Sequence, residues 1–473
     1  MGCQPMSSVK NTGGPPVPRK SGIIPGLMST LSAGGGGELV RERRDSIAAA
    51  KTPSSDRPDV ATELRVPDAP LPALPVTERL VSLDAYRGLV MVLMVSAGLR
   101  IAQVVTSFEA SPDLRHLKTP LWDFLAYQTD HAAWVGCSLW DMIQPSFMFM
   151  VGAALPFSIA ARRAKGQTMG DLWVHAVMRS VALVLLGVFL MSSWTFDNVL
   201  TQIGLGYAFL FLLAWAKPRW QLAAAVAILV AYWAAFALYP KPAPDASLAA
   251  LNLPADWHRL TGFASHWEKH NNLGARVDQW FVNLFPRPDG KRFEYNEGGY
   301  VTLNFVPSIA TMVFGLLAGE LIRSRRATPG RTVGTLVAAG LLALAIGWTL
   351  NVTGICPVVK RLWTPSWAVF STGWALLMLA AFYYVLDVAR WRARLRPWAM
   401  PLVVVGMNSI AAYCISMVLK PWVRDTVRRH FGQGVFEVPF GKVYAPMVDA
   451  AVFLLFTWAA CWWMYRRKLF VRI

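Results

Sequence analysis

The sequence predicts an all-α polytopic membrane protein with about ten transmembrane helices and with both termini in the cytoplasm. Apolar residues make up 55% of the 473 residues and charged residues only 16%, whereas soluble domains carry about 25% charge. Long apolar runs recur along the chain, and most reach the roughly 17–25 residues that a helix needs to cross a bilayer. This composition excludes a disordered chain, a coiled coil and a disulfide-rich secreted scaffold.

Ten segments are predicted to cross the membrane as helices, because a helix satisfies its backbone hydrogen bonds internally where lipid offers none. The first carries Asp84, Arg87 and Arg100, the last carries Asp449, and the other eight have no charged residue. In chain order they are Val81–Val105, Met142–Ala161, Ser180–Phe196, Asn198–Ala216, Trp220–Tyr239, Tyr300–Gly319, Thr332–Asn351, Leu362–Leu386, Pro397–Leu419 and Val443–Tyr465.

The basic residues orient this bundle. The formal net charge is +18, and short basic loops at Arg162–Lys165, Arg323–Arg331 and Arg390–Arg396 fall on one side of the predicted topology. The positive-inside rule places that side in the cytoplasm. Membrane topology therefore accounts for the positive charge, together with affinity for anionic lipid, and no nucleic-acid partner is expected.

Three segments lie outside the spans. Residues 1–78 are rich in Gly, Pro and Ser and contain no spanning run, which predicts a disordered cytoplasmic tail. The loops at residues 106–140 and 240–299 are long and fall on the outer side. The second is aromatic and mixed in charge, so we expect a folded cap there, and residues 79–473 form the membrane domain.

Polar residues within or beside apolar spans are candidates for function, because burying them in a membrane is unfavourable. Asp84 and Arg87 are three positions apart and share one helix face; the alternative is an interfacial anchor with an incidental ion pair. His131 stands before the second span with Trp134 and Asp141 nearby. Histidine transfers protons near neutral pH, although a single loop histidine can also be structural or solvated.

Two further candidate clusters occur later in the chain. Lys360 and Trp363 lie at the start of the eighth span, where a cation can also simply extend its charge to the interface. Asn408 lies inside the ninth span and needs hydrogen-bond partners there, either from neighbouring helices or from a ligand. Gly315 and Gly319 have the spacing of close helix packing. No residues have metal-ligand spacing, so no metal is expected.

Seven short segments recur in an order that is hard to obtain by chance. They are Arg79–Gly88, His131–Gly136, Phe147–Gly152, Val199–Tyr207, Glu297–Gly299, Pro357–Trp363 and Gly406–Ile410. Their order resembles the heparan-alpha-glucosaminide N-acetyltransferase family of transmembrane acetyltransferases over roughly residues 79–465, in the form of an uncharacterised bacterial subfamily. The chain departs from the family pattern at Gly98 and Val135, which replace asparagines, and at Gln202, which replaces an arginine.

The resemblance implies a homodimeric N- or O-acetyltransferase that takes an acetyl group from cytosolic acetyl-CoA and delivers it to an amino sugar or glycan across a bacterial cytoplasmic membrane. It makes His131 the active-site histidine, acting as a general base or as an acetyl carrier. Lys360, Arg87 or Asn408 would orient the CoA or polarise its thioester. The alternatives are a transporter or flippase on the same fold, and a ligand-binding membrane protein that uses the cap.

The topology is directly testable. We expect positions near Gln128 and Asp289 to face outward and positions near Gly166 and Ala393 to face the cytoplasm, because short basic loops are retained inside. A scan of single cysteines with a membrane-impermeant reagent measures this. Labelling of Asp289 and Gly166 positions from the same side would contradict the ten-helix topology.

Overall fold

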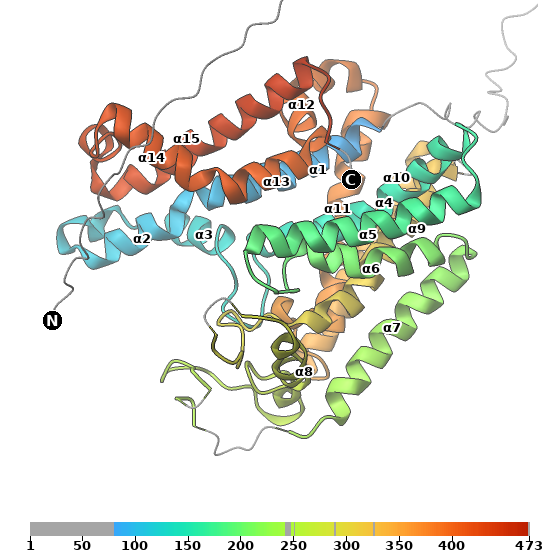
Figure 1. Cartoon of the computed structure of the whole chain (residues 1–473), viewed down its shortest axis with the longest axis horizontal. Coiled ribbons are helices and arrows are strands. Elements are labelled where there is room, and N and C mark those ends of the chain that lie inside the picture. Colours follow the sequence, from blue (N-terminus) through green and yellow to red (C-terminus); the bar gives the residue numbers. More distant parts are fainter. Residues whose placement is uncertain (1–79, 242–246, 250, 288–289, 325–326, 472–473) are drawn as a thin grey trace, which may run out of the picture. The chain divides into compact units, whose positions relative to one another are not determined.

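The computed structural model describes residues 80–241, 247–249, 251–287, 290–324 and 327–471 (Figure 1). The chain divides into two units, Met1–Pro67 and Asp68–Ile473, and the fold described below belongs to the second. Its described residues form helices without any β-strand, which confirms the predicted fold class. The tail predicted at residues 1–78 lies outside the described residues.

Eight helical segments are long and apolar enough to cross a membrane. They are Val81–Ala110, Trp140–Arg163, Met169–Met191, Pro218–Leu238, Thr302–Ser324, Pro329–Val352, Pro365–Val388 and Glu437–Arg466. The helices within them are α1 (Val81–Ser96), α2 (Ile101–Ala110), α4 (Ile143–Arg163), α5 (Met169–Met191), α7 (Pro218–Leu238), α9 (Phe305–Ser324), α10 (Pro329–Val352), α11 (Pro365–Tyr383) and α15 (Glu437–Arg466). Short helices outside these segments are α3 (Pro120–Gln128), α8 (Leu273–Phe281) and α14 (Lys420–Phe431).

The other two predicted spans differ from simple transmembrane helices. The fourth forms only the 15-residue helix α6 (Val199–Leu213), which ends before the predicted Ala216 and begins where the Asn198 side chain accepts the backbone N–H groups of Leu200 and Thr201. The ninth is broken into α12 (Arg392–Met407) and α13 (Ser409–Val418), which are bent by 66°. The described residues therefore contain eight candidate spans, or nine with the broken pair, where the sequence predicts about ten.

The helices pack through small residues. The most extensive pairs are α4 with α9, α10 with α11, α1 with α12, and α5 with α6. A Cβ added to Gly315 of α9 would collide with the carbonyl oxygen of Phe149 in α4, and one added to Gly152 would collide with that of Met312. The two backbones are therefore in direct contact. This confirms the close packing predicted from Gly315 and Gly319.

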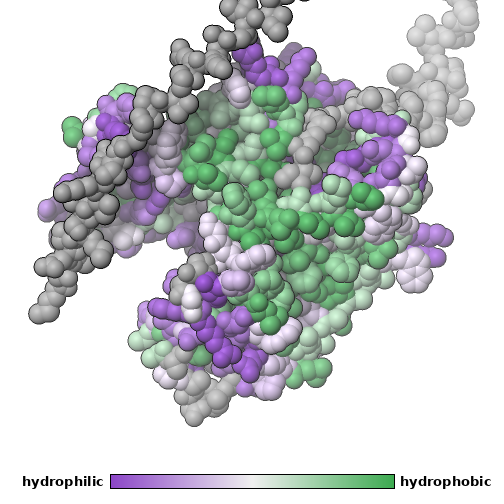
Figure 2. Space-filling view, in the orientation of Figure 1, coloured by the Kyte–Doolittle hydropathy of each residue, from purple (hydrophilic) through white to green (hydrophobic). Residues whose placement is uncertain are grey.

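A hydrophobic band and a polar cap divide the surface. Figure 2 shows a broad apolar area over the helices, with hydrophilic surface gathered towards their ends and over the cap loops. The described part of the cap contains α8 and a short 3₁₀ helix, Gly262–Trp267. Trp267 is fully buried in a cluster with Tyr232 and Phe236 of α7 and Leu362, so this segment packs onto the bundle. An apolar belt between polar ends is what a bilayer requires.

The contact of α4 with α9 gives a stability prediction. Gly315→Ala should lower the free energy of unfolding by about 1–3 kcal/mol, the usual cost of overpacking, because the new methyl group meets backbone that cannot move aside. Gly334→Ala in α10 is the matched control, since a Cβ there has open space around it. Thermal unfolding in detergent measures both. Equal melting temperatures for the two variants would contradict the tight crossing.

Candidate active site

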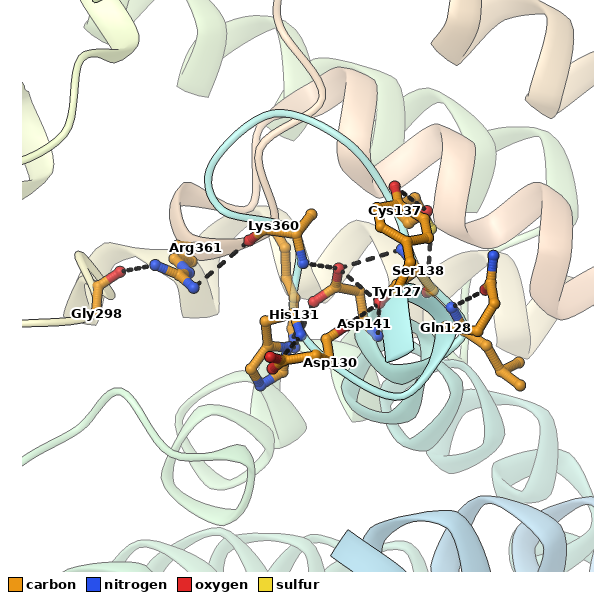
Figure 3. A network of polar contacts seen from close by, with 12 residues as sticks. Tyr127, Gln128, Asp130, His131, Cys137, Ser138, Asp141, Gly298, Lys360 and Arg361 are labelled. Atoms are coloured by element: carbon orange, nitrogen blue, oxygen red, sulfur yellow. Dashed lines mark hydrogen bonds and ion pairs between the residues drawn. The ribbon is translucent and has the colours of Figure 1, made fainter. Parts of the chain in front are cut away.

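The centre of the site is a histidine–carboxylate pair (Figure 3). His131 lies in the segment between α3 and the 3₁₀ turn Trp140–Met142, and Asp141 lies in that turn, directly before α4. His131 Nδ1 is 2.7 Å from Asp141 Oδ1. The carboxylate side chain is only 2% exposed, whereas that of His131 is 34% exposed. The structure therefore combines a buried acid with a histidine that a substrate can reach.

The second oxygen of Asp141 is held by its own chain segment. Asp141 Oδ2 accepts hydrogen bonds from the backbone N–H groups of Ala132 at 3.0 Å and Ser138 at 3.2 Å, and from Ser138 Oγ at 3.1 Å. A carboxylate fixed in this way can accept the Nδ1 hydrogen of His131 and so orient the ring. In the tautomer that donates from Nδ1 to Asp141, Nε2 carries no hydrogen and is the basic nitrogen of the site.

Lys360 completes the charge balance of this pair. Its Nζ lies 3.2 Å from Asp141 Oδ1 and 3.2 Å from His131 Nδ1. The Lys360 side chain is only 7% exposed, so the alternative of an interfacial cation extending to water is wrong for this residue. A buried carboxylate needs such a partner to remain ionised at little cost. Lys360 and Asp141 are separated by 219 positions in the sequence, and the fold brings them together.

Arg361 joins three segments around the pair. Its guanidinium donates to the carbonyl oxygen of Gly298 at 2.8 Å and to that of Ala132 at 3.5 Å. The backbone N–H of Gly136 also donates to Val358 O at 3.0 Å. The loop of His131, the end of the cap and the segment before α11 are thus locked to one another. The roles of Ser138 and Arg361 were not predicted from the sequence. The Ser-x-x-Asp spacing of Ser138 and Asp141 is a local capping signal that could have indicated the role of Ser138.

Trp134 connects the site to the cap. The indole is buried and donates from Nε1 to the carbonyl oxygen of Trp267 at 3.0 Å. Gly299 packs against the same ring and has φ of +79°, so a side chain there would be strained and would also collide with Trp134. Trp134 therefore docks the loop of His131 onto the cap.

The remaining predicted residues lie apart from the pair. Trp363 is fully buried and donates from Nε1 to Thr311 Oγ1 of α9 at 3.2 Å, so it anchors the Lys360 segment against the bundle. Asp84 and Arg87 form the predicted ion pair on α1, at 3.5 Å. Arg87 lines a separate cavity.

That cavity, of about 290 Å³, is cationic at one end. Its lining includes Arg87, Arg162, His175 and Arg179. One face of α4 forms a wall, with Phe147, Val151, Ala154, Ser158 and Arg162 at helical spacing. This face begins at Phe147, fewer than two helical turns from Asp141, and ends among the cations. The wall therefore extends along most of α4, an α-helix whose axis rises about 1.5 Å per residue.

Asn408 lies beside this cavity, at the break between α12 and α13. Its side chain is fully buried, and neither amide atom has a hydrogen-bond partner within the described part of the chain. Its neighbours Met407, Ser409 and Ile410 line the cavity. Bonds to neighbouring helices, one of the two alternatives from the sequence, are not formed by this side chain, and a buried amide left unpaired is unfavourable. The remaining alternative, a ligand contact, is taken up below.

Side chains that could bind a metal ion do not cluster in the described part of the chain. Within the described ranges no group of three or more His, Cys, Asp or Glu residues could hold a metal ion.

Comparison with known proteins gives one relationship. No family model matches the chain. The chain is 23% identical over 390 residues to heparan-alpha-glucosaminide N-acetyltransferase of Homo sapiens, a match that covers 72% of this chain and 53% of that protein. The Mus musculus protein of the same name is 23% identical over 388 residues, covering 72% and 54%. These matches support a distant relationship to that family. The chain spans about half the length of these curated relatives.

The junction between cap and bundle contains an unusual carboxyl group. Asp278 of α8 accepts the backbone N–H of Thr302, with contacts of 2.9 and 3.2 Å to its two oxygens. Burial raises the pKa of the Asp278 carboxyl to about 7, well above its ordinary value near 4. The folded chain therefore holds a proton here that the unfolded chain releases, between about pH 4 and pH 7.

This proton gives a pH prediction. The unfolding free energy should fall as pH rises from about 4 to 7, because the native state binds more protons in that window. We expect the Asp278→Asn variant to lose part of this dependence, whereas Asp113→Asn, at an exposed position, should keep it. Melting temperatures measured between pH 4.5 and 8 test this. If the melting temperature of the Asp278→Asn variant depended on pH as steeply as that of the wild type, the raised pKa of Asp278 would be contradicted.

Proposed function

We propose that this chain is a membrane acetyltransferase that transfers an acetyl group from cytosolic acetyl-CoA to an amino sugar or glycan on the opposite side of a bacterial cytoplasmic membrane. The observation that carries the proposal is the His131–Asp141 pair, with its buried, fully bonded carboxylate and its accessible imidazole. The similarity to two curated N-acetyltransferases supports the same reaction class. A homodimer, as the family resemblance implies, is part of the proposal.

The chemistry follows from the orientation of the ring. His131 Nε2 removes a proton from the acceptor amine or hydroxyl as that group attacks the thioester carbonyl carbon. The new C–N or C–O bond forms, the C–S bond breaks, and the proton on His131 passes to the CoA thiolate. Asp141 stabilises the imidazolium that exists between these two steps, and Lys360 keeps Asp141 ionised. An acetyl group carried briefly on His131 would use the same nitrogen.

The cationic cavity suits the acyl donor. Coenzyme A carries phosphate groups, which arginine binds well through its planar set of donors. Arg87, Arg162 and Arg179 lie at one end of the cavity, and the α4 wall leads from them towards Asp141. Under this proposal the phosphates lie among the arginines, and the pantetheine arm follows α4 past Met407, Ser409 and Ile410, the neighbours of Asn408, whose amide has no partner among the described residues.

The sidedness of the reaction comes from charge. Arg162 lies in the last turn of α4, at a short basic connection that the positive-inside rule retains in the cytoplasm, whereas His131 precedes the opposite end of α4. The donor phosphates and the acceptor would therefore lie near opposite faces of the membrane. Acetyl transfer through the bundle is then vectorial.

Sealed vesicles of known orientation test the proposal. Labelled acetyl-CoA supplied at the cytoplasmic face should acetylate a glucosamine-containing acceptor supplied only at the other face. His131→Ala should lower turnover about 10²–10⁴-fold, the usual contribution of a positioned base, while CoA binding persists. Asp141→Asn should lower kcat by up to about 10⁴-fold through the wrong tautomer. His116→Ala, at an exposed position in the same outer loop, is the control.

The outcomes separate the alternatives. A transporter would move solute without acetyl-CoA and would tolerate His131→Ala. A ligand-binding protein would depend on the cap and would consume no donor. Wild-type acetyl transfer by both His131→Ala and His131→Asn would remove the catalytic assignment, because asparagine nearly preserves the shape of the ring but cannot act as a base.

A further inference from the structure

A second cationic pocket is distinct from the cavity that Arg87, Arg162 and Arg179 line. It has a volume of about 360 Å³ and is formed by the turn after α1 together with α13, α14 and α15. Three cations, Arg100, Lys420 and Arg424, line it with apolar side chains and two carboxylates, of which Asp425 is exposed. The buried carboxylate, Asp449, is paired with Arg424 at 3.0 Å. The pocket therefore has more positive than negative charge.

Two of the three cations of this pocket, Arg100 and Lys420, have no carboxylate paired with them among the described residues, whereas Arg424 is paired with Asp449. Within the described part of the chain, neither Arg100 nor Lys420 forms an ion pair, and the buried Nε atoms of Arg100 and Arg424 have no hydrogen-bond acceptor. Lys420 faces the ring of Phe453, 5.8 Å from its centroid. Burial and the neighbouring arginines lower the pKa of Lys420. Cations brought together without acceptors are unfavourable unless an anion joins them.

Strained backbone carries Arg100 into this position. Ala97, Gly98, Leu99 and Arg100 have φ values of +49°, +61°, +48° and +54°, so the chain makes one left-handed turn between α1 and α2. Each non-glycine residue in this conformation costs about 1–2 kcal/mol. A continuous right-handed helix would avoid that cost. Strain of this kind persists where it positions a functional group.

Helix length places the pocket near the depth of lipid headgroups. The 16 residues of α1 rise about 24 Å, so the turn that follows is near the edge of a hydrocarbon layer about 30 Å thick. The neighbouring helix α14 is amphipathic and exposes Trp422 and Phe431 by 58% and 75%, which is typical of a helix that lies in the interface. An ordered turn also connects this region to the site, because Gly98 packs against Thr129, two residues before His131.

We propose that this pocket binds the headgroup of an anionic phospholipid. The headgroup phosphate accepts hydrogen bonds from Arg100, Lys420 and Arg424, and the acyl chains lie against the apolar wall that includes Val452 and Phe453. Lipid is favoured over a soluble anion because the cations are combined with apolar lining and an interfacial helix.

Native mass spectrometry of the delipidated full-length protein tests this inference. Phosphatidylglycerol, phosphatidylcholine and inorganic phosphate are added separately. Phosphatidylglycerol should bind most tightly and raise the melting temperature. Arg100→Gln and Lys420→Gln should each weaken its binding about five-fold, the factor that corresponds to about 1 kcal/mol per basic residue near an anionic surface. Arg429→Gln, which removes the same charge from an exposed position of α14 outside the pocket, should leave binding unchanged.

The following results would contradict the proposed lipid site. Equal affinity of wild type and the Arg100→Gln/Lys420→Gln double variant for phosphatidylglycerol would overturn the site. Equal binding of phosphatidylcholine, or displacement of phosphatidylglycerol by low concentrations of inorganic phosphate, would overturn the assignment to an anionic lipid. If the double variant does not fold, the wild-type protein is tested alone. Its affinity for phosphatidylglycerol must fall as salt is added, and an affinity that salt does not change rejects the proposal.

Discussion

The buried carboxylate of Asp141 is the interaction on which the site depends. It accepts hydrogen bonds from its own loop, orients His131 and compensates the charge of Lys360. Removing it would leave a buried ammonium group unpaired and a loop without its anchor. Because its two oxygens face different partners, one group fixes both the local loop and a segment more than two hundred residues away. The geometry of the candidate site and the local fold therefore depend on one network.

Backbone contact between helices supplies the frame for that network. Glycines on α4 and α9, and on α1 and α12, bring main chains together without intervening side chains. Such contacts leave little freedom for sliding, since helix backbones are stiff and the fit is steric. The start of α4, which carries Asp141, is therefore held in place by the rest of the bundle. The cap adds a second constraint through Trp134 and Trp267.

The sequence predicted the helical class and the location of most spans, because hydropathy depends on local composition alone. It also indicated His131, Asp141 and Lys360, since polar groups next to apolar spans are conspicuous. It did not reveal that these three share one network, because their proximity arises from tertiary packing. The short α6 and the break at Asn408 were also missed. A capping asparagine and a single unbonded amide inside an apolar run leave a hydropathy profile unchanged.

The left-handed turn at 97–100 also escaped prediction, because it lies within what reads as one apolar span. Leucine and arginine disfavour that conformation, and the turn is held by its own backbone hydrogen bonds and by packing against Thr129 and α15.

The break between α12 and α13 has a mechanical consequence. An intact helix resists bending because its i to i−4 hydrogen bonds would have to lengthen. At Asn408 the backbone has already left the helical conformation, with φ of −120° and ψ of 33°, so the two halves meet at a hinge. Helix α12 is fastened to α1 by glycine contacts, whereas α13 packs less extensively on its neighbours. Rotation of α13 alone would widen or narrow the cavity that Arg87, Ser409 and Tyr413 line, while the α1–α12 pair stays still.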